Sequence, residues 1–300
     1  TGAITVSNAI DINGSGSEVK AAFDAIDTNT GNATANITGT DYTIAQLKSI
    51  NADTTGAIVL AAPTATLSGT VADIVAAFAG SVTTNTGAVT ISDPDETDIT
   101  ATDITTINTA ISGAITVSNA IDINGSGADV ATAVGHLDTL SGTPTANISG
   151  TDYTVAQLKT INDAIGGALV LENSGVNLSG TVAQFKAAFN ETVTTHTGTI
   201  TISDAGTTDI TATDITAIDT ASTGNITVSN AIDINGSGSE VAAAFTAIDT
   251  NTGNATANVT GNDYTAANLK TINDATTGAI VLADASAALS GDSTVLAAAF

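Results

Sequence analysis

The stretch that decides the fold is GAITVSNAIDINGSG at residues 2–16, because the same fifteen letters return at residues 113–127. A third copy, GNITVSNAIDINGSG, occupies residues 224–238. The copies begin at Gly2, Gly113 and Gly224, so the chain repeats every 111 residues. Self-similarity at a fixed period is typical of proteins built by stacking one structural unit many times.

Each long repeat divides into four shorter units that open on a glycine. The spacings between these glycines are 29, 25, 31 and 26 residues, in the same order each time. The opening glycines are Gly2, Gly31, Gly56, Gly87, Gly113, Gly142, Gly167, Gly198, Gly224, Gly253 and Gly278. Units of this length are typical of solenoids, in which each coil contacts only its neighbours.

Every unit follows one plan of two short strands and a helix. Apolar residues alternate after the glycine, as at Ile4 and Val6, which predicts a strand with one buried face. A second apolar segment follows, and then a Ser or Thr stands three residues before an acid or amide, which predicts a capped helix start. The ten predicted caps are Ser15/Glu18, Thr43/Gln46, Thr70/Asp73, Thr100/Asp103, Ser126/Asp129, Thr154/Gln157, Thr181/Gln184, Thr211/Asp214, Ser237/Glu240 and Thr265/Asn268.

These patterns predict an α/β solenoid of stacked strand–strand–helix coils, each of about 25–31 residues. First strands are expected to pair in parallel from coil to coil, second strands likewise, and the helices form a third row. We expect one continuous solenoid over residues 1–300, with long repeats 2–112, 113–223 and a truncated 224–300. A leucine-rich-repeat-like horseshoe is the alternative, although its Leu/Asn consensus is missing.

Composition excludes several classes of function. The formal net charge of −25 disfavours nucleic acid and anionic membrane surfaces as partners. The chain has no cysteine, which excludes disulfides and cysteine-based zinc sites. It has no apolar run long enough to span a bilayer, so we expect no membrane insertion. The absence of methionine and the start and stop within coils indicate a processed chain, a window of a longer array, or a protomer that stacks end to end.

Residues that could carry chemistry have simpler structural interpretations. Tyr42, Tyr153 and Tyr264 each precede a capping Thr, where the ring can pack on the helix as a hydrophobic staple. The tyrosines, with Gly2, Gly113 and Gly224, are therefore expected to be structural. The two histidines, His136 and His196, stand without a catalytic or metal-binding partner set at readable spacing, so we expect surface positions. We expect no catalytic residues, no cofactor, no small-molecule ligand and no enzymatic activity.

The densest acidic cluster is a weak candidate for calcium. Its carboxylates belong to Asp93, Asp95, Glu96 and Asp98, and calcium prefers six to eight oxygen ligands. One period later only Asp204 and Asp209 remain, which favours a solvated acidic turn. Calcium therefore stays a possible cofactor. A ligand-binding module is the rival functional class.

Threonines on the first strands raise a further alternative, ice binding, which we rank below the others. The expected outward file comprises Thr5, Thr34, Thr90, Thr116, Thr201 and Thr227. It lacks the ranks of Thr-x-Thr that ice-binding solenoids carry, and regular outward Thr is what strand propensity alone gives.

Runs such as TDYTIAQLKSIN (40–51), ITATDITTIN (99–108) and TGAITVSNAIDI (1–12) carry a resemblance. They resemble the tandem repeats of very large secreted bacterial surface proteins, with marine cyanobacteria the first group to name. The resemblance implies export, by type I secretion, to a cell-surface layer, fibre or adhesin stalk. The expected function is an extracellular structural or adhesive array, part of a filament or S-layer-like assembly that works by axial or lateral self-association.

Overall fold

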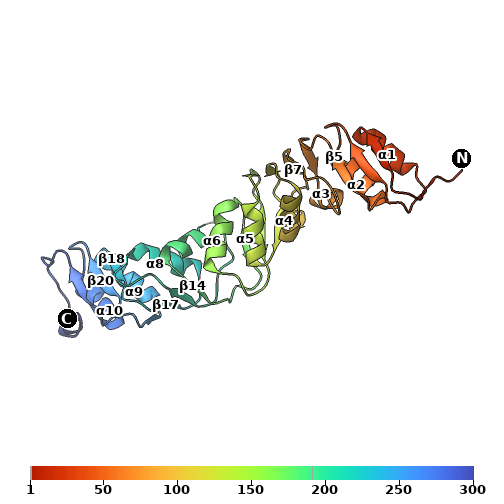
Figure 1. Cartoon of the computed structure of the whole chain (residues 1–300). Helices are drawn as coiled ribbons and strands as arrows, with labels where there is room; N and C mark the ends of the chain where they lie inside the picture. The colour runs from red at the N-terminus through yellow and green to blue at the C-terminus, as the bar shows by residue number, and fades with distance from the viewer. Residues whose placement is uncertain (1, 191) are drawn as a thin grey trace. The chain divides into compact units, whose positions relative to one another are not determined.

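The computed structural model describes residues 2–190 and 192–300 and shows an α/β fold in which short strands and helices alternate along the chain (Figure 1). It contains two compact units, which are described separately. Unit 1 holds residues up to Asn147 together with Ala164–Gly167, and unit 2 holds Ile148–Asp163 and Ala168–Phe300. None of the described sheets closes into a barrel.

Unit 1 repeats the strand–helix plan throughout. Its helices are α1 (Gly16–Asp24), α2 (Ile44–Asp53), α3 (Val71–Ala77), α4 (Ala101–Ala110) and α5 (Gly127–Gly135). Its strands are β1 (Thr5–Val6), β2 (Asp11–Gly14), β3 (Thr28–Asn29), β4 (Thr34–Ile37), β5 (Ile58–Leu60), β6 (Leu67–Gly69), β7 (Val89–Ile91), β8 (Asp98–Thr100), β9 (Ile115–Val117), β10 (Asp122–Gly125), β11 (Thr139–Leu140) and β12 (Thr145–Ile148). Parallel pairs join β1 to β3, β2 to β4 to β5, β6 to β7 to β9 to β11, and β8 to β10.

Unit 2 has the same organisation. Its helices are α6 (Val155–Ala164), α7 (Val182–Ala188), α8 (Ala212–Ala221), α9 (Gly238–Ala247), α10 (Ala266–Ala275) and α11 (Ser293–Ala298). Its strands are β13 (Leu169–Leu171), β14 (Leu178–Gly180), β15 (Ile200–Ile202), β16 (Asp209–Thr211), β17 (Ile226–Val228), β18 (Asp233–Gly236), β19 (Thr250–Asn251), β20 (Thr256–Val259) and β21 (Ile280–Leu282). Two parallel sheets run β14–β15–β17–β19 and β16–β18–β20–β21.

The expected pairing of first strands with first strands is correct at some steps and wrong at others. It holds from the Gly87 unit to the Gly113 unit, where β7 pairs with β9 and β8 with β10. After Gly31, however, one strand, β4, replaces the expected two, and it pairs with the second strand β2. The strand β3, which pairs with β1, instead lies before Gly31. The turn that carries the chain to the next sheet therefore falls on either side of the glycine, depending on the unit.

The predicted helix caps are confirmed at nine of the ten sites. In each of the nine, the Ser or Thr hydroxyl accepts a hydrogen bond from the backbone three residues later. Thr211 is the exception, because it makes no side-chain cap bond to Asp214. The Asp214 carboxylate instead lies 2.7 Å from the Lys186 ammonium. Since the first long repeat has Val75 in place of Lys186, Thr100 keeps its cap there.

The opening glycines mark places where adjacent segments of backbone approach closely. A Cβ atom at Gly113 would lie 2.1 Å from the Gly87 carbonyl oxygen, and one at Gly224 would lie 1.7 Å from the Gly198 oxygen. The opening glycines from Gly31 to Gly278 all show such contacts with the preceding coil, at 1.7–2.4 Å. These distances leave no room for a Cβ, which explains why glycine opens each unit. Gly2, by contrast, has open space around it.

Candidate functional site

The four residues of the acidic cluster each take part in a structural contact. Asp93 is buried, and its carboxylate accepts a 2.7 Å hydrogen bond from the Val71 backbone N–H. The Asp95 carboxylate accepts from the Ala120 N–H at 2.8 Å, and the Asp98 carboxylate from the Asn124 amide at 2.9 Å. The neighbour between them, Glu96, has a left-handed backbone with φ 61°, and its N–H donates to the Ala120 carbonyl.

The second long repeat reproduces this arrangement in unit 2. The Asp204 carboxylate accepts from the Val182 N–H at 2.8 Å, and the Asp209 carboxylate accepts from the Asn235 amide at 3.1 Å. Among residues 2–190 and 192–300, no three Asp, Glu or His side chains converge as a metal site would require. The acidic loop therefore connects one coil to the next through hydrogen bonds, and its oxygens do not surround a common point as metal ligands would.

Aspartate carboxylates accept hydrogen bonds from distant backbone N–H groups in both units, a role that the sequence interpretation missed. Eight aspartates accept a backbone N–H from a residue 22–25 positions away in the chain: Asp27, Asp41, Asp93, Asp95, Asp138, Asp204, Asp249 and Asp263. Charged acceptors make hydrogen bonds stronger than neutral ones do. Much of the acidic composition is thus used within the fold. The signal was present in the sequence, since Asp27, Asp138 and Asp249 recur at the 111-residue period.

Asparagine side chains form ladders that run from strand to strand. In unit 1, the Asn147 amide donates to the Asn124 oxygen at 2.6 Å, and Asn124 in turn donates to Asp98. In unit 2, the Asn258 amide donates to Asn235 at 3.0 Å, and Asn235 donates to Asp209. These bonds fix the register of the parallel strands, because a slip of one residue would move every amide to the opposite face of the sheet.

The three tyrosines are buried, with 2–4% of their surface exposed, so none offers a binding platform. The Tyr42 hydroxyl donates to the Asn85 oxygen at 3.0 Å and reaches the Ala62 carbonyl at 3.2 Å. The Tyr153 hydroxyl donates to the Asn173 carbonyl at 2.5 Å, and the Tyr264 hydroxyl to the Asp284 carbonyl at 2.9 Å. Burial raises the pKa of Tyr42 and of Tyr153 above the usual value of 10.0.

The expectation that both histidines lie on the surface is wrong for His196. Its side chain has no exposed surface, whereas His136 is half-buried at the end of α5. The His196 Nε2 atom lies 2.7 Å from the Val176 carbonyl oxygen, so Nε2 carries the donated hydrogen. The Nδ1 atom lies 3.3 Å from the Ser222 hydroxyl. Burial lowers the pKa of His196 below its usual 6.5 and favours the neutral ring.

His196 occupies a position that recurs two residues before an opening glycine. Asn85, its counterpart one period earlier, is also fully buried and donates to the Ala65 and Gly87 carbonyls at 3.1 and 2.9 Å. Buried polar side chains stand at the same offset at Thr54, Ser222 and Thr276. Each donates a hydrogen bond from its hydroxyl to a backbone carbonyl 21–26 residues earlier in the chain, so the buried hydroxyl has a partner. The offset from the glycine, visible in the sequence, was the signal for this role.

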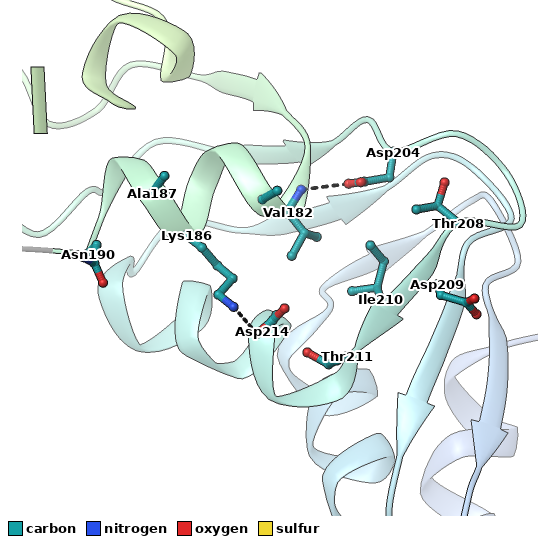
Figure 2. Close-up of a pocket in the computed structure, with 11 residues that line it drawn as sticks. Val182, Lys186, Ala187, Asn190, Asp204, Thr208, Asp209, Ile210, Thr211 and Asp214 are labelled. Atoms are coloured by element: carbon teal, nitrogen blue, oxygen red, sulfur yellow. Dashed lines mark hydrogen bonds and ion pairs between the residues drawn. The ribbon is translucent and has the colours of Figure 1, made fainter. Parts of the chain in front are cut away.

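A groove in unit 2 has charged walls (Figure 2). It measures about 490 Å³ and lies between α7 on one side and β16 and the start of α8 on the other. Val182 and Ile210 line it, and its charged side chains already have partners, because Asp204 binds the Val182 N–H and Lys186 pairs with Asp214 (Figure 2). Asp209 also lines the groove, and its carboxylate accepts from the Asn235 amide, so we assign this groove no chemistry, since each of its charged side chains is bonded within the fold.

The outward threonines that we expected to form one continuous row do not all lie on neighbouring strands of the same sheet. Thr90 pairs with Thr116 in unit 1, and Thr201 pairs with Thr227 in unit 2, as expected of neighbouring strands. Thr5, however, pairs with Thr28, and Thr34 pairs with Asp11 in another sheet. The hydroxyl rows are therefore short and divided among sheets.

The pKa values of several carboxylates are lowered, and each shift has a local cause. A hydrogen bond from the Ser15 backbone lowers the pKa of Glu18, and the Ser237 backbone does the same for Glu240. Hydrogen bonds from lysine side chains lower the pKa of Asp24, through Lys20, and that of Asp73, through Lys48. All four carboxylates are exposed, so these shifts describe helix caps and surface ion pairs rather than a catalytic acid or base.

Comparison with protein-family models, curated proteins and solved structures finds no match to this chain. Over the residues that the structure describes, no helix has the length and apolar character needed to cross a membrane.

Proposed function

We propose that the chain is a continuous strand–strand–helix solenoid that serves as a structural or adhesive array and works by self-association. In this proposal it is a secreted protein, a non-enzymatic segment of a cell-surface fibre, filament or S-layer-like assembly in a very large bacterial surface protein. The resemblance of its repeats to those of such proteins supports this setting.

One observation carries the proposal: polar contacts recur at the same period and bind coil to coil. Asp93 and Asp204 cap the backbone at Val71 and Val182, while Asn124 and Asn235 donate to Asp98 and Asp209. These contacts join one coil to the next and so stabilise the array itself. Repetition without a unique site favours a mechanical or scaffolding role.

In this proposal, electrostatic repulsion between molecules controls their association. With a net charge of −25, neighbouring molecules repel one another at low ionic strength. Salt at about 0.1 M screens charges beyond roughly 10 Å and at about 1 M beyond roughly 3 Å. Association should therefore increase as NaCl rises from low concentration to that of seawater.

Sedimentation velocity across this NaCl series, with negative-stain electron microscopy of the same samples, tests the proposal. We expect the sedimentation coefficient to rise with salt and with protein concentration, and filaments or lateral arrays to be visible at high salt. A single monomeric species at every salt and protein concentration would contradict it.

A calcium-binding surface module is the second candidate, favoured by one feature of the sheets. In-register pairing places Asp98 beside Asp122 in unit 1 and Asp209 beside Asp233 in unit 2. Neighbouring strands lie about 4.8 Å apart, so one cation can bridge each carboxylate pair. If calcium bridges them, it should raise the melting temperature at constant ionic strength, and Asp122→Asn with Asp233→Asn should abolish the rise. If screening alone operates, NaCl and CaCl₂ of equal ionic strength should give equal shifts.

A further inference from the structure

The sequence contains one Asp–Pro peptide bond, between Asp93 and Pro94, in the loop that joins β7 to β8. An aspartate can attack its own carbonyl carbon, because a five-membered ring brings the carboxylate oxygen and the carbon together at high effective concentration. Proline then leaves as a secondary amine. Proline also has no backbone N–H, so this nitrogen cannot attack the aspartate side chain in the competing reaction that forms a succinimide.

The fold holds the reacting groups of this bond in fixed positions. Asp93 is only 6% exposed, and its Oδ2 atom accepts a hydrogen bond from the Val71 N–H at 2.7 Å. The Asp93 carbonyl oxygen accepts a hydrogen bond from the Asn119 side-chain amide at 2.5 Å. A fixed donor aimed at a carbonyl oxygen stabilises the negative charge that develops there when the carbonyl carbon is attacked. The departing residue, Pro94, is exposed, so its nitrogen can take a proton from the solvent.

Unit 2 contains the same arrangement with one difference. The Asp204 carboxylate accepts from the Val182 N–H at 2.8 Å, and the Asn230 amide donates to the Asp204 carbonyl at 2.7 Å. The residue that follows Asp204 is Ala205, however, where the first long repeat has Pro94. Unit 2 is therefore a natural control in which the same contacts surround an ordinary peptide bond.

We propose that the chain cleaves its own backbone between Asp93 and Pro94, with Asn119 as the catalytic hydrogen-bond donor. A lone pair of the Asp93 carboxylate forms a C–O bond to the Asp93 carbonyl carbon, and the resulting oxyanion accepts from the Asn119 amide. The C–N bond then breaks as Pro94 nitrogen takes a proton from a hydronium ion, which leaves a cyclic anhydride on Asp93. Water opens the anhydride, so one water molecule is consumed and the products are an Asp93 carboxylate and a Pro94 amine.

The nick would fall where the fold already joins both fragments. The fragments are residues 1–93 and 94–300, and β7 of the first pairs in parallel with β9 of the second. Helix α3 of the first also packs on α4 of the second. The fragments therefore stay associated until the chain is unfolded. The reaction occurs once per molecule, and it is independent of the proposed self-association because it needs no second chain.

Time courses of the full chain in mildly acidic buffer, read by denaturing electrophoresis and intact mass, test the inference. The buffer is set at the lowest pH at which circular dichroism still shows the folded chain, and a parallel sample at that pH is unfolded in urea. We expect two fragments, 1–93 and 94–300, whose masses together exceed that of the chain by one water. The folded chain should cleave at least about tenfold faster than the unfolded chain, since one such donor is worth about 10²–10³ in rate. The rate should not depend on protein concentration.

Each variant has its matched control one period away. Asn119→Ala should slow cleavage at least about tenfold, whereas Asn230→Ala, which removes the same bond from unit 2, should leave it unchanged. Asp93→Asn should abolish cleavage, and Asp204→Asn should not affect it. Ala205→Pro should create a second cleavage site, between residues 204 and 205, that Asn230→Ala slows.

Three outcomes would overturn the inference: no 1–93 and 94–300 pair, cleavage of the folded chain no faster than in urea, or equal rates for Asn119→Ala and Asn230→Ala. The second outcome would show the ordinary acid sensitivity of an Asp–Pro bond without any contribution from the fold. Failure of the self-association proposal is separate, because a chain that stays monomeric at every salt concentration would still cleave at the same first-order rate.

Discussion

Replacing an opening glycine by alanine should destabilise the fold more where the new Cβ lies closer to neighbouring backbone. The equivalent glycines of the three long repeats serve as controls for one another. Gly2, Gly113 and Gly224 are equivalent in sequence but not in surroundings. A Cβ at Gly113 would lie 2.1 Å from the Gly87 oxygen, whereas ordinary contact begins at 3.4 Å. The two backbone segments must therefore separate by about 1.3 Å, the difference between these distances.

The cost of that separation follows from the flanking hydrogen bonds. Ser112 N–H donates to the Asn85 carbonyl and Val89 N–H to the Ala114 carbonyl, both at 2.8 Å. A displacement of this size breaks both bonds, each worth about 1 kcal/mol net, and overpacking adds about 1–3 kcal/mol. We expect Gly113→Ala to cost about 3–5 kcal/mol, Gly224→Ala at least as much, and Gly2→Ala about zero.

Hydrogen exchange and urea denaturation followed by circular dichroism measure these differences. Exchange is needed because long repeat arrays often unfold in parts rather than in one step. Gly113→Ala should accelerate exchange in β7 and β9, and Gly2→Ala should leave the urea midpoint unchanged. Gly135→Ala, at the end of α5 where a Cβ meets no atom within 4 Å, should be neutral or stabilising. Equal effects at Gly2 and Gly113 would refute the reasoning.

Three further predictions follow from the buried polar groups and the net charge. Tyr42→Phe should lower the free energy of unfolding by about 1–3 kcal/mol, since it leaves the buried Asn85 oxygen without its phenol donor; an unchanged thermal midpoint would contradict this. Because burial lowers the folded-state pKa of His196, the unfolded chain binds more protons, so stability should be complete above about pH 6.5 and decline as pH falls below it. His196→Asn should remove that component in pH-dependent melts, and His136→Asn should not. Raising NaCl should increase the melting temperature, because it screens the net charge of −25; a salt-independent melting temperature would contradict this.

The periodic features could be predicted from the sequence, and the contacts between periods could not. The strand–helix alternation and nine of the ten caps depend on local spacing, which a sequence displays directly. The burial of His196 and the pairing of Asp214 with Lys186 each depend on a neighbour about 20–30 residues away, which local patterns do not reveal. The eight backbone-binding aspartates look like solvated charges until the next coil is placed against them. Comparison of equivalent positions one period apart, such as Asn85 with His196, is the sequence evidence that comes closest to showing them.

Cysteine cross-linking measures the central claim, coil-on-coil parallel stacking at fixed register, most directly. The chain has no native cysteine, so every disulfide formed comes from an introduced pair. Thr90 and Thr116 are partners in adjacent parallel strands, about 4.8 Å apart and within the range that a disulfide spans. Thr90→Cys with Thr116→Cys should therefore form an intramolecular disulfide under mild oxidation. Thr90→Cys with Thr139→Cys, two strands apart at roughly 9.6 Å, should not. Equal cross-linking of the two pairs, or none in the adjacent pair, would contradict the stacked architecture.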